Sequence, residues 1–292
     1  MRSLKPPIRN LGPRLARQAA LVRVVIFLLL LGMLWAPTAL VIYGSGRYLN
    51  FEAAASTLAL IVLYLLFIWL LRHWGRAVNR WAHPLSHCGL RWSSSFATSV
   101  CQALCVGTLA VFGLFGFETL LGWAAPQTPT WSLLPITLEG LLVAVGIGFA
   151  EELFFRGWLL SELEQDYSPS LSLVISALVF AIAHFIRPLP EIIRTAPQFL
   201  GLVILGMTLA WARRVPTGRR WQRHRSNLGL AIGLHAGLVW GYYIIKVGNL
   251  TQLTQTVPAW VTGIDGNPLA GIIGLTLLSL LAVKFAQTAG KT

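Results

Sequence analysis

Charged residues are scarce in this sequence: Asp, Glu, Lys and Arg make up 11% of its 292 residues, against 55% for the hydrophobic types. Soluble domains carry roughly 25% charged residues, so this chain has too few to cover a surface exposed to water. Disordered chains lack the hydrophobic residues in which this one is rich, so disorder is excluded as well. The mean hydropathy of +0.67 therefore indicates an integral membrane protein with several spans.

Cysteine and acidic residues are also few. The three cysteines, Cys88, Cys101 and Cys105, are odd in number and do not have zinc-ligand spacing, so no disulfide framework is expected. Only 10 acidic residues stand against 23 basic ones, which gives a net charge of +13. The basic residues gather between apolar runs, as juxtamembrane anchors do, and no basic face recurs on a soluble element. We therefore expect the lipid bilayer, and no nucleic acid, as a partner.

Eight apolar stretches approach the length of about 17–25 residues that a transmembrane helix needs. They predict helices at about 21–43, 56–72, 98–121, 136–163, 170–187, 198–212, 228–247 and 268–286. With eight spans, 19 of the 23 Lys and Arg residues fall on the side of the N-terminus, and four fall on the other side: Arg47, Arg187, Arg194 and Lys246. The positive-inside rule then places both termini in the cytoplasm.

The sequence thus predicts an all-α fold, a polytopic transmembrane helical bundle of about eight spans. Residues 1–20 are expected to form a basic cytoplasmic tail, and residues 21–290 a single transmembrane helical domain. The expected location is a bacterial plasma membrane. An organellar membrane stays open as an alternative, because residues 1–20 are rich in Arg and contain no acidic residue.

A few ionisable residues lie inside the apolar stretches, where burial in lipid costs at least about 2.5–3.5 kcal/mol. They are Glu151, Glu152, Arg156, His184 and His235. On a helix, Glu152 and Arg156 are four residues apart and can form an ion pair. Glu151 is rotated about 100° from Glu152 and has no basic partner on its own helix. A structural ion-pair network therefore explains Glu152 and Arg156 but not Glu151, which favours a working carboxylate.

The expected depths of three of these residues agree. At 1.5 Å per residue, Glu151, His184 and His235 lie about 18, 21 and 11 Å from the expected cytoplasmic boundary. All three depths fall around the middle of a core about 30 Å thick, so we expect a shared site. The helix that carries His235 also has a glycine at every fourth position: Gly229, Gly233, Gly237 and Gly241. This stripe predicts close packing against another helix, with His235 on the opposite side.

Together these residues resemble the CPBP family of membrane proteins, which includes the type II CAAX prenyl proteases and bacterial Abi-type proteins. The family pattern is Glu-Glu-x-x-x-Arg, Phe-x-x-x-His and His-x-x-x-Asn or Asp. The first motif matches at Glu151 to Arg156, the second at Phe180 and His184, and the third begins at His235. The resemblance covers about residues 130–250.

The last motif departs from the family at its fourth position. Val239 stands where the family has an amide or carboxylate that helps to stabilise the oxyanion, and valine cannot donate a hydrogen bond. Tyr242 is seven residues after His235, on nearly the same helix face, and its hydroxyl is a candidate substitute.

The resemblance implies an intramembrane endopeptidase that hydrolyses a peptide bond of a membrane-associated substrate, CAAX-type prenylated peptides among them. Glu151 would be the general base, assisted by His184, and His235 would donate to the oxyanion. Glu152 and Arg156 would hold Glu151 in place. No cofactor is firmly expected, although zinc bound by Glu151, His184 and His235 is the alternative.

Two other classes of function compete with the protease. A non-catalytic scaffold or immunity-type membrane protein would keep the polar cluster for helix packing, and Val239 supports that reading. A small-solute transporter is disfavoured, because no inverted repeat or pair of broken helices is visible.

Overall fold

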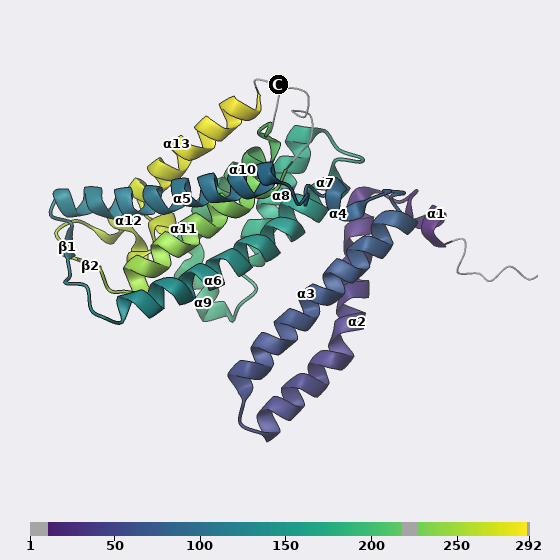
Figure 1. Cartoon of the computed structure of the whole chain (residues 1–292), viewed down its shortest axis with the longest axis horizontal. Coiled ribbons are helices and arrows are strands. Elements are labelled where there is room, and N and C mark those ends of the chain that lie inside the picture. The colour runs from purple at the N-terminus through teal and green to yellow at the C-terminus, as the bar shows by residue number, and fades with distance from the viewer. Residues whose placement is uncertain (1–10, 218–226, 291–292) are drawn as a thin grey trace, which may run out of the picture. The chain divides into compact units, whose positions relative to one another are not determined.

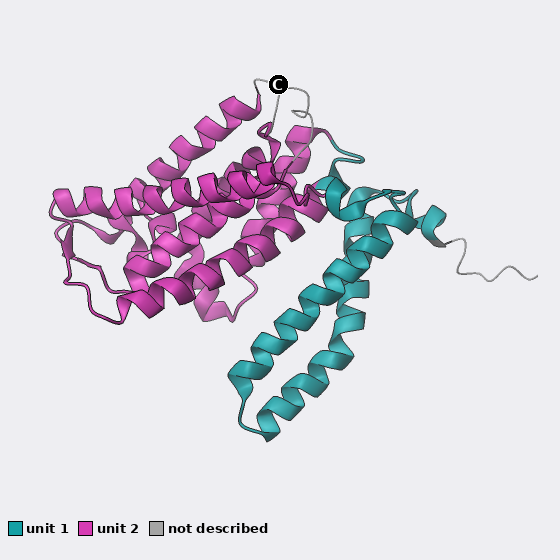
Figure 2. Cartoon of the chain, viewed as in Figure 1, with its two compact units in different colours: residues 1–87, 161–167 teal, residues 88–160, 168–292 magenta. Residues whose placement is uncertain are grey.

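A computed structural model of the chain describes residues 11–217 and 227–290. The first half of the expected basic tail and the basic segment 218–226 lie outside these residues. Two compact units make up the chain, one of residues 1–87 and 161–167 and one of residues 88–160 and 168–292 (Figure 2). Here they are called unit 1 and unit 2. The single domain expected over 21–290 stays a prediction.

Helices long and apolar enough to cross a membrane number seven in the described part of the chain: Ala20–Tyr48, Glu52–Ala77, Ser94–Leu120, Leu133–Leu163, Leu189–Arg214, Gly229–Val247 and Ile272–Ala289. The all-α, multi-pass fold is thereby confirmed. The stretch expected to span at 170–187 is shorter than predicted, because α8 (Pro169–Ala183) has only 15 residues. Pro188 disfavours the helical conformation at Arg187, but the helix already ends four residues before that, at Ala183.

Unit 1 is built on a hairpin of two long helices, α2 (Ala20–Tyr48) and α3 (Glu52–Ala77) (Figure 1). Phe27 packs edge-to-face against Phe67 and Trp74, with ring centroids 6.0 and 5.5 Å apart. Two short helices flank the hairpin: α1 (Leu11–Leu15) and α4 (Pro84–His87). The segment 161–167 joins this unit through a buried ion pair between Arg23 Nε and Glu162 Oε1, 2.6 Å apart.

Unit 2 is arranged around α11 (Gly229–Val247), the most deeply buried of the long helices. Its glycine stripe faces α5 (Ser94–Leu120), since a Cβ on Gly233 or Gly237 would meet the α5 backbone at Val100 or Leu104. The packing face predicted from the glycine spacing is therefore present. On other sides α11 contacts α6 (Leu133–Glu152) and α10 (Phe199–Arg214).

The remaining elements of unit 2 cover this centre. Helices α8 and α13 (Ile272–Ala289) both pack on α10. A short antiparallel pair joins two connections, with Ala124 opposite Leu253. The other short elements are β1 (Ala124–Pro126), β2 (Thr251–Leu253), α9 (Leu189–Thr195), η3 (Ala196–Gln198), α12 (Ala259–Thr262), η5 (Ile264–Gly266) and η6 (Pro268–Ala270).

Candidate active site

The paired glutamates end a regular helix. Helix α6 ends at Glu152. The chain continues as η2 (Leu153–Leu159), a π-helix, and then as α7 (Leu160–Leu163). An uninterrupted α-helix was expected over 136–163, so the π-helix is a correction. Stretches of π-helix are rare and are frequent at functional sites. Here the π-helix directly follows Glu151 and Glu152 and buries the Arg156 side chain completely.

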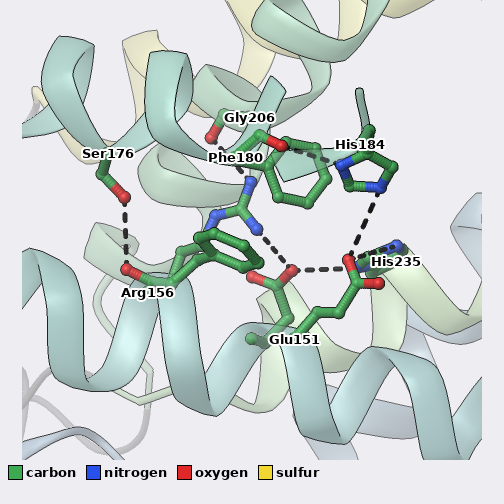
Figure 3. A network of polar contacts seen from close by, with 9 residues as sticks. Glu151, Arg156, Ser176, Phe180, His184, Gly206 and His235 are labelled. Atoms are coloured by element: carbon green, nitrogen blue, oxygen red, sulfur yellow. Dashed lines mark hydrogen bonds and ion pairs between the residues drawn. The ribbon is translucent and has the colours of Figure 1, made fainter. Parts of the chain in front are cut away.

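Glu152 is the centre of a buried polar network, and its partners Arg156 and His235 are labelled in Figure 3. Its Oε1 accepts hydrogen bonds from Arg156 Nη1 and from His235 Nδ1, each 2.8 Å long. The guanidinium also donates to the carbonyl of Gly206 at 3.2 Å and lies 4.2 Å from the ring centroid of Phe180. Glu152 and Arg156 are both fully buried. The expected ion pair between them is present, and it fixes the His235 ring as well.

Glu151 lies beside this network and contacts both histidines. Its Oε2 is 3.9 Å from His184 Nε2 and 4.0 Å from His235 Nε2, and it accepts no hydrogen bond from any described residue. The side chain is 30% exposed, in contrast to Glu152. These separations are too long for direct hydrogen bonds, and Glu151 Oε2 itself is buried. The structure thus brings together the three residues expected to share a site.

The two imidazole rings present the same nitrogen to Glu151. His184 Nδ1 lies 2.8 Å from the carbonyl oxygen of Phe180, which can only accept, so Nδ1 carries a proton. His235 Nδ1 donates to Glu152 in the same way. His184 is the residue after α8 rather than a residue within a span, which corrects the expected helix. Non-helical backbone in a membrane protein is tolerated where it lines a cavity, as it does here.

Two cavities meet at His235 and Val239 on α11. One of about 190 Å³ is almost entirely apolar and is lined by side chains of α5, α10, α11 and α13. The other, of about 240 Å³, is more polar and includes His184 and Arg187. Tyr242 lines the apolar cavity, but its hydroxyl donates to the carbonyl of Gly266 at 3.1 Å. That proton is therefore not free to replace the donor missing at Val239.

Asn267 is a polar residue that the sequence analysis did not find. It precedes η6 and lines both cavities together with His235 and Val239. It lies beyond residues 130–250, where the motifs are, and a lone asparagine near Gly and Pro reads as an ordinary turn residue. Only the chain fold brings it next to the site.

The donor atoms do not fit a zinc ion as they are placed. Ligand atoms about 2.0–2.1 Å from a tetrahedral zinc lie about 3.4 Å from one another. Glu151 Oε2 is 3.9 and 4.0 Å from the two histidine nitrogens. Among the residues that the structure describes, no group of three His, Cys, Asp or Glu side chains is arranged to hold a metal.

In the described part of the chain, seven helices of membrane-spanning length and a buried ionisable cluster define a multi-pass integral membrane protein with an internal polar site. Residues 133–241 match the family described as type II CAAX prenyl endopeptidase, Rce1-like. Over these residues, which are fewer than half of the chain, the sequence is similar to that family, so the resemblance drawn from the motifs is confirmed. The matched segment contains Glu151, Glu152, Arg156, His184 and His235. No curated protein and no solved structure matched the chain.

Proposed function

We propose that this protein is an intramembrane endopeptidase that hydrolyses a peptide bond with water activated by Glu151 and His184. The observation that carries the proposal is the position of Glu151 Oε2, which lies 3.9 and 4.0 Å from two imidazole Nε2 atoms. Because Glu152 and the Phe180 carbonyl occupy both Nδ1 atoms, each ring has its Nε2 available for substrate or water.

In this proposal the attacking water lies between Glu151 and His184. With hydrogen bonds of about 2.8 Å, one water oxygen reaches both Glu151 Oε2 and the neutral His184 Nε2. Its two hydrogens point to these acceptors, and a lone pair faces the substrate carbonyl. As the water oxygen bonds to the carbonyl carbon, Glu151 takes a proton from it. The same carboxyl then delivers this proton to the amide nitrogen as the carbon–nitrogen bond breaks.

His235 is placed to stabilise the oxyanion that forms. Its Nδ1 proton is donated to Glu152, so the ring donates from Nε2 in its imidazolium form. Glu152 orients the ring through this bond, and Arg156 holds Glu152. In this scheme Glu152 and Arg156 are positioning residues. A single donor of this kind is worth about 2.7–4 kcal/mol of transition-state stabilisation.

The substrate class follows from the family match and from the cavities. Membrane-associated peptides, including CAAX-type prenylated ones, are the substrates that the matched family supports. The apolar cavity of about 190 Å³ beside His235 offers a place for an apolar group of such a peptide. Burial of apolar surface there would contribute about 25 cal/mol per Å².

The variant Glu151→Gln tests the proposal, because the amide keeps the shape of the side chain but cannot take a proton. Hydrolysis of a fluorogenic prenylated peptide by the purified protein should fall roughly 10²–10⁴-fold. Glu52→Gln, an exposed position at the start of α3, is the matched control and should keep wild-type activity. A Glu151→Gln variant with wild-type activity contradicts the mechanism. A wild-type chain that leaves the peptide intact favours the scaffold, which Val239 also suits.

A further inference from the structure

The proposed oxyanion site has only one donor on α11. Oxyanion sites gain from several preorganised donors, yet Val239, one turn after His235 and beside both cavities, has none. Of the other polar side chains at the cavities, Arg187 and Gln198 line only the more polar cavity, and Tyr242 and Thr195 are already engaged. Tyr242 donates to the Gly266 carbonyl, and Thr195 Oγ1 donates to the Glu191 carbonyl at 2.7 Å.

The side-chain amide of Asn267 has a free hydrogen-bond donor beside the same two cavities. Its Oδ1 accepts a hydrogen bond from the backbone N–H of Leu269 at 3.0 Å, which fixes the plane of the amide at the start of η6. Within the described part of the chain, its Nδ2 has no hydrogen-bond partner. Asn267 lines both cavities that His235 and Val239 line, whereas the amide of Gln198 lines only the more polar cavity.

Side chains of two neighbouring helices, α9 and α11, hold the loop that carries Asn267. Asp265 Oδ2 accepts from Arg194 Nη1 of α9 at 2.9 Å, and the Gly266 carbonyl accepts from Tyr242 of α11. Asp265 has a φ of 56°, a left-handed conformation that persists only where surrounding contacts hold it. Such support is what a donor needs in order to be preorganised.

We propose that Asn267 is a catalytic residue whose Nδ2 donates a second hydrogen bond to the oxyanion, in the place that Val239 leaves without a donor. This inference rests on the proposed function. It assigns the role to a loop outside the matched segment, 26 residues beyond its end at residue 241.

Asn267→Asp separates the donor from the structural cap. A carboxylate oxygen still accepts from Leu269 N–H, but both amide hydrogens are lost. We expect kcat for the prenylated peptide to fall roughly 10²–10³-fold, while KM changes less than about threefold. The affinity of the variant for a peptide phosphinate, whose anionic oxygen imitates the oxyanion, should fall by a similar factor. Its affinity for the substrate in the ground state should not fall.

Asn227→Asp is the matched control. Asn227 lies just before α11, with Oδ1 accepting from Gly229 N–H at 2.7 Å and Nδ2 donating to Thr217 Oγ1 at 3.0 Å, and it lines neither cavity. Its kcat should equal that of the wild type. Should Asn267→Asp fail to fold, Asn267→Ser replaces it, since the serine hydroxyl can also accept from Leu269 N–H. The same loss of kcat in that variant supports the proposal.

The outcomes are distinct. In one outcome, the wild type hydrolyses the peptide, the Glu151→Gln variant does not, and the folded Asn267→Asp or Asn267→Ser variant keeps the wild-type kcat. That outcome overturns only the role of Asn267. If the wild type does not hydrolyse the peptide, the proposed function falls, and the role of Asn267 falls with it.

Discussion

Arg156 is a fully buried cation that forms an ion pair with the Glu152 carboxylate at 2.8 Å. Removing one partner of a buried pair leaves the other charge without compensation, which is more costly than removing both. His235 depends on the same carboxylate for its orientation. Both the stability of the core and the geometry of the site therefore depend on Glu152.

We expect Glu152→Gln and Arg156→Met each to destabilise the protein by roughly 3–5 kcal/mol. In the double variant Glu152→Gln/Arg156→Met the two losses should not add, because no unpaired charge remains buried. Thermal unfolding of the three variants in detergent micelles measures this difference. Strictly additive losses would show that the pair is not the coupled unit that the 2.8 Å contact indicates.

Sequence reasoning worked for residues that stand out from apolar surroundings. The positions of Glu151, Glu152 and Arg156 on one helix, and the pairing of two of them, followed from spacing alone. The tautomers of His184 and His235 did not, since their hydrogen-bond partners come from other turns and helices. Asn267 was missed because a polar loop residue has no periodicity to mark it.

Helix α11 depends on close contact with α5. A Cβ built on Gly237 falls within van der Waals distance of the Leu104 backbone, and one on Gly233 within that of Val100. Backbone atoms cannot move aside as a flexible side chain can, so the two helices must separate to accept a larger residue. Because His235 lies between these glycines on the chain, separation of the helices also displaces its ring.

Gly237→Ala should therefore lower both the thermal midpoint and kcat, with a stability loss of roughly 1–3 kcal/mol from overpacking. Gly113→Ala on α5 is the matched control, because a Cβ there meets nothing within 4 Å. That control should be neutral or slightly stabilising, since alanine favours helix over glycine by roughly 0.5–1 kcal/mol. Calorimetry or fluorescence-detected melting, followed by peptide hydrolysis, checks both variants. Equal behaviour of the two would refute the contact argument.

At the level of elements, hydrophobic length predicted most helices but not their irregularities. The apolar stretch 136–163 corresponds to the continuous helix Leu133–Leu163, yet nothing in its composition indicates the π-helical segment Leu153–Leu159. The end of α8 at Ala183 was not predictable in this way, because Pro188 restricts only Arg187, the residue before it.

Within unit 2 the connections agree with alternating spans when α8, which is shorter than the seven helices of spanning length, also crosses. Strands β1 and β2 pair, although one follows α5 and the other follows α11. Both connections fall on the same side in the arrangement predicted from the basic residues. Arg194 and Asp265, which also pair, fall on that side too. A third contact, between Arg214 and the carbonyl of Pro169, falls on the opposite side. Each of these three contacts joins segments that are distant in the sequence. None of them could form if one of the helices between the two segments failed to reverse the direction of the chain.

The absolute orientation is still a prediction, because the same alternation holds if the whole arrangement is inverted. The excess of basic residues on one side places both termini in the cytoplasm and the β1–β2 pair outside it. Replacing the three native cysteines and introducing Thr128→Cys near β1 or Gly290→Cys after α13 tests this in intact cells, since both positions are exposed. A membrane-impermeant maleimide should label the first variant and spare the second until the cells are opened. Labelling in the reverse pattern would invert the arrangement, and the basic segments would then act as something other than cytoplasmic anchors.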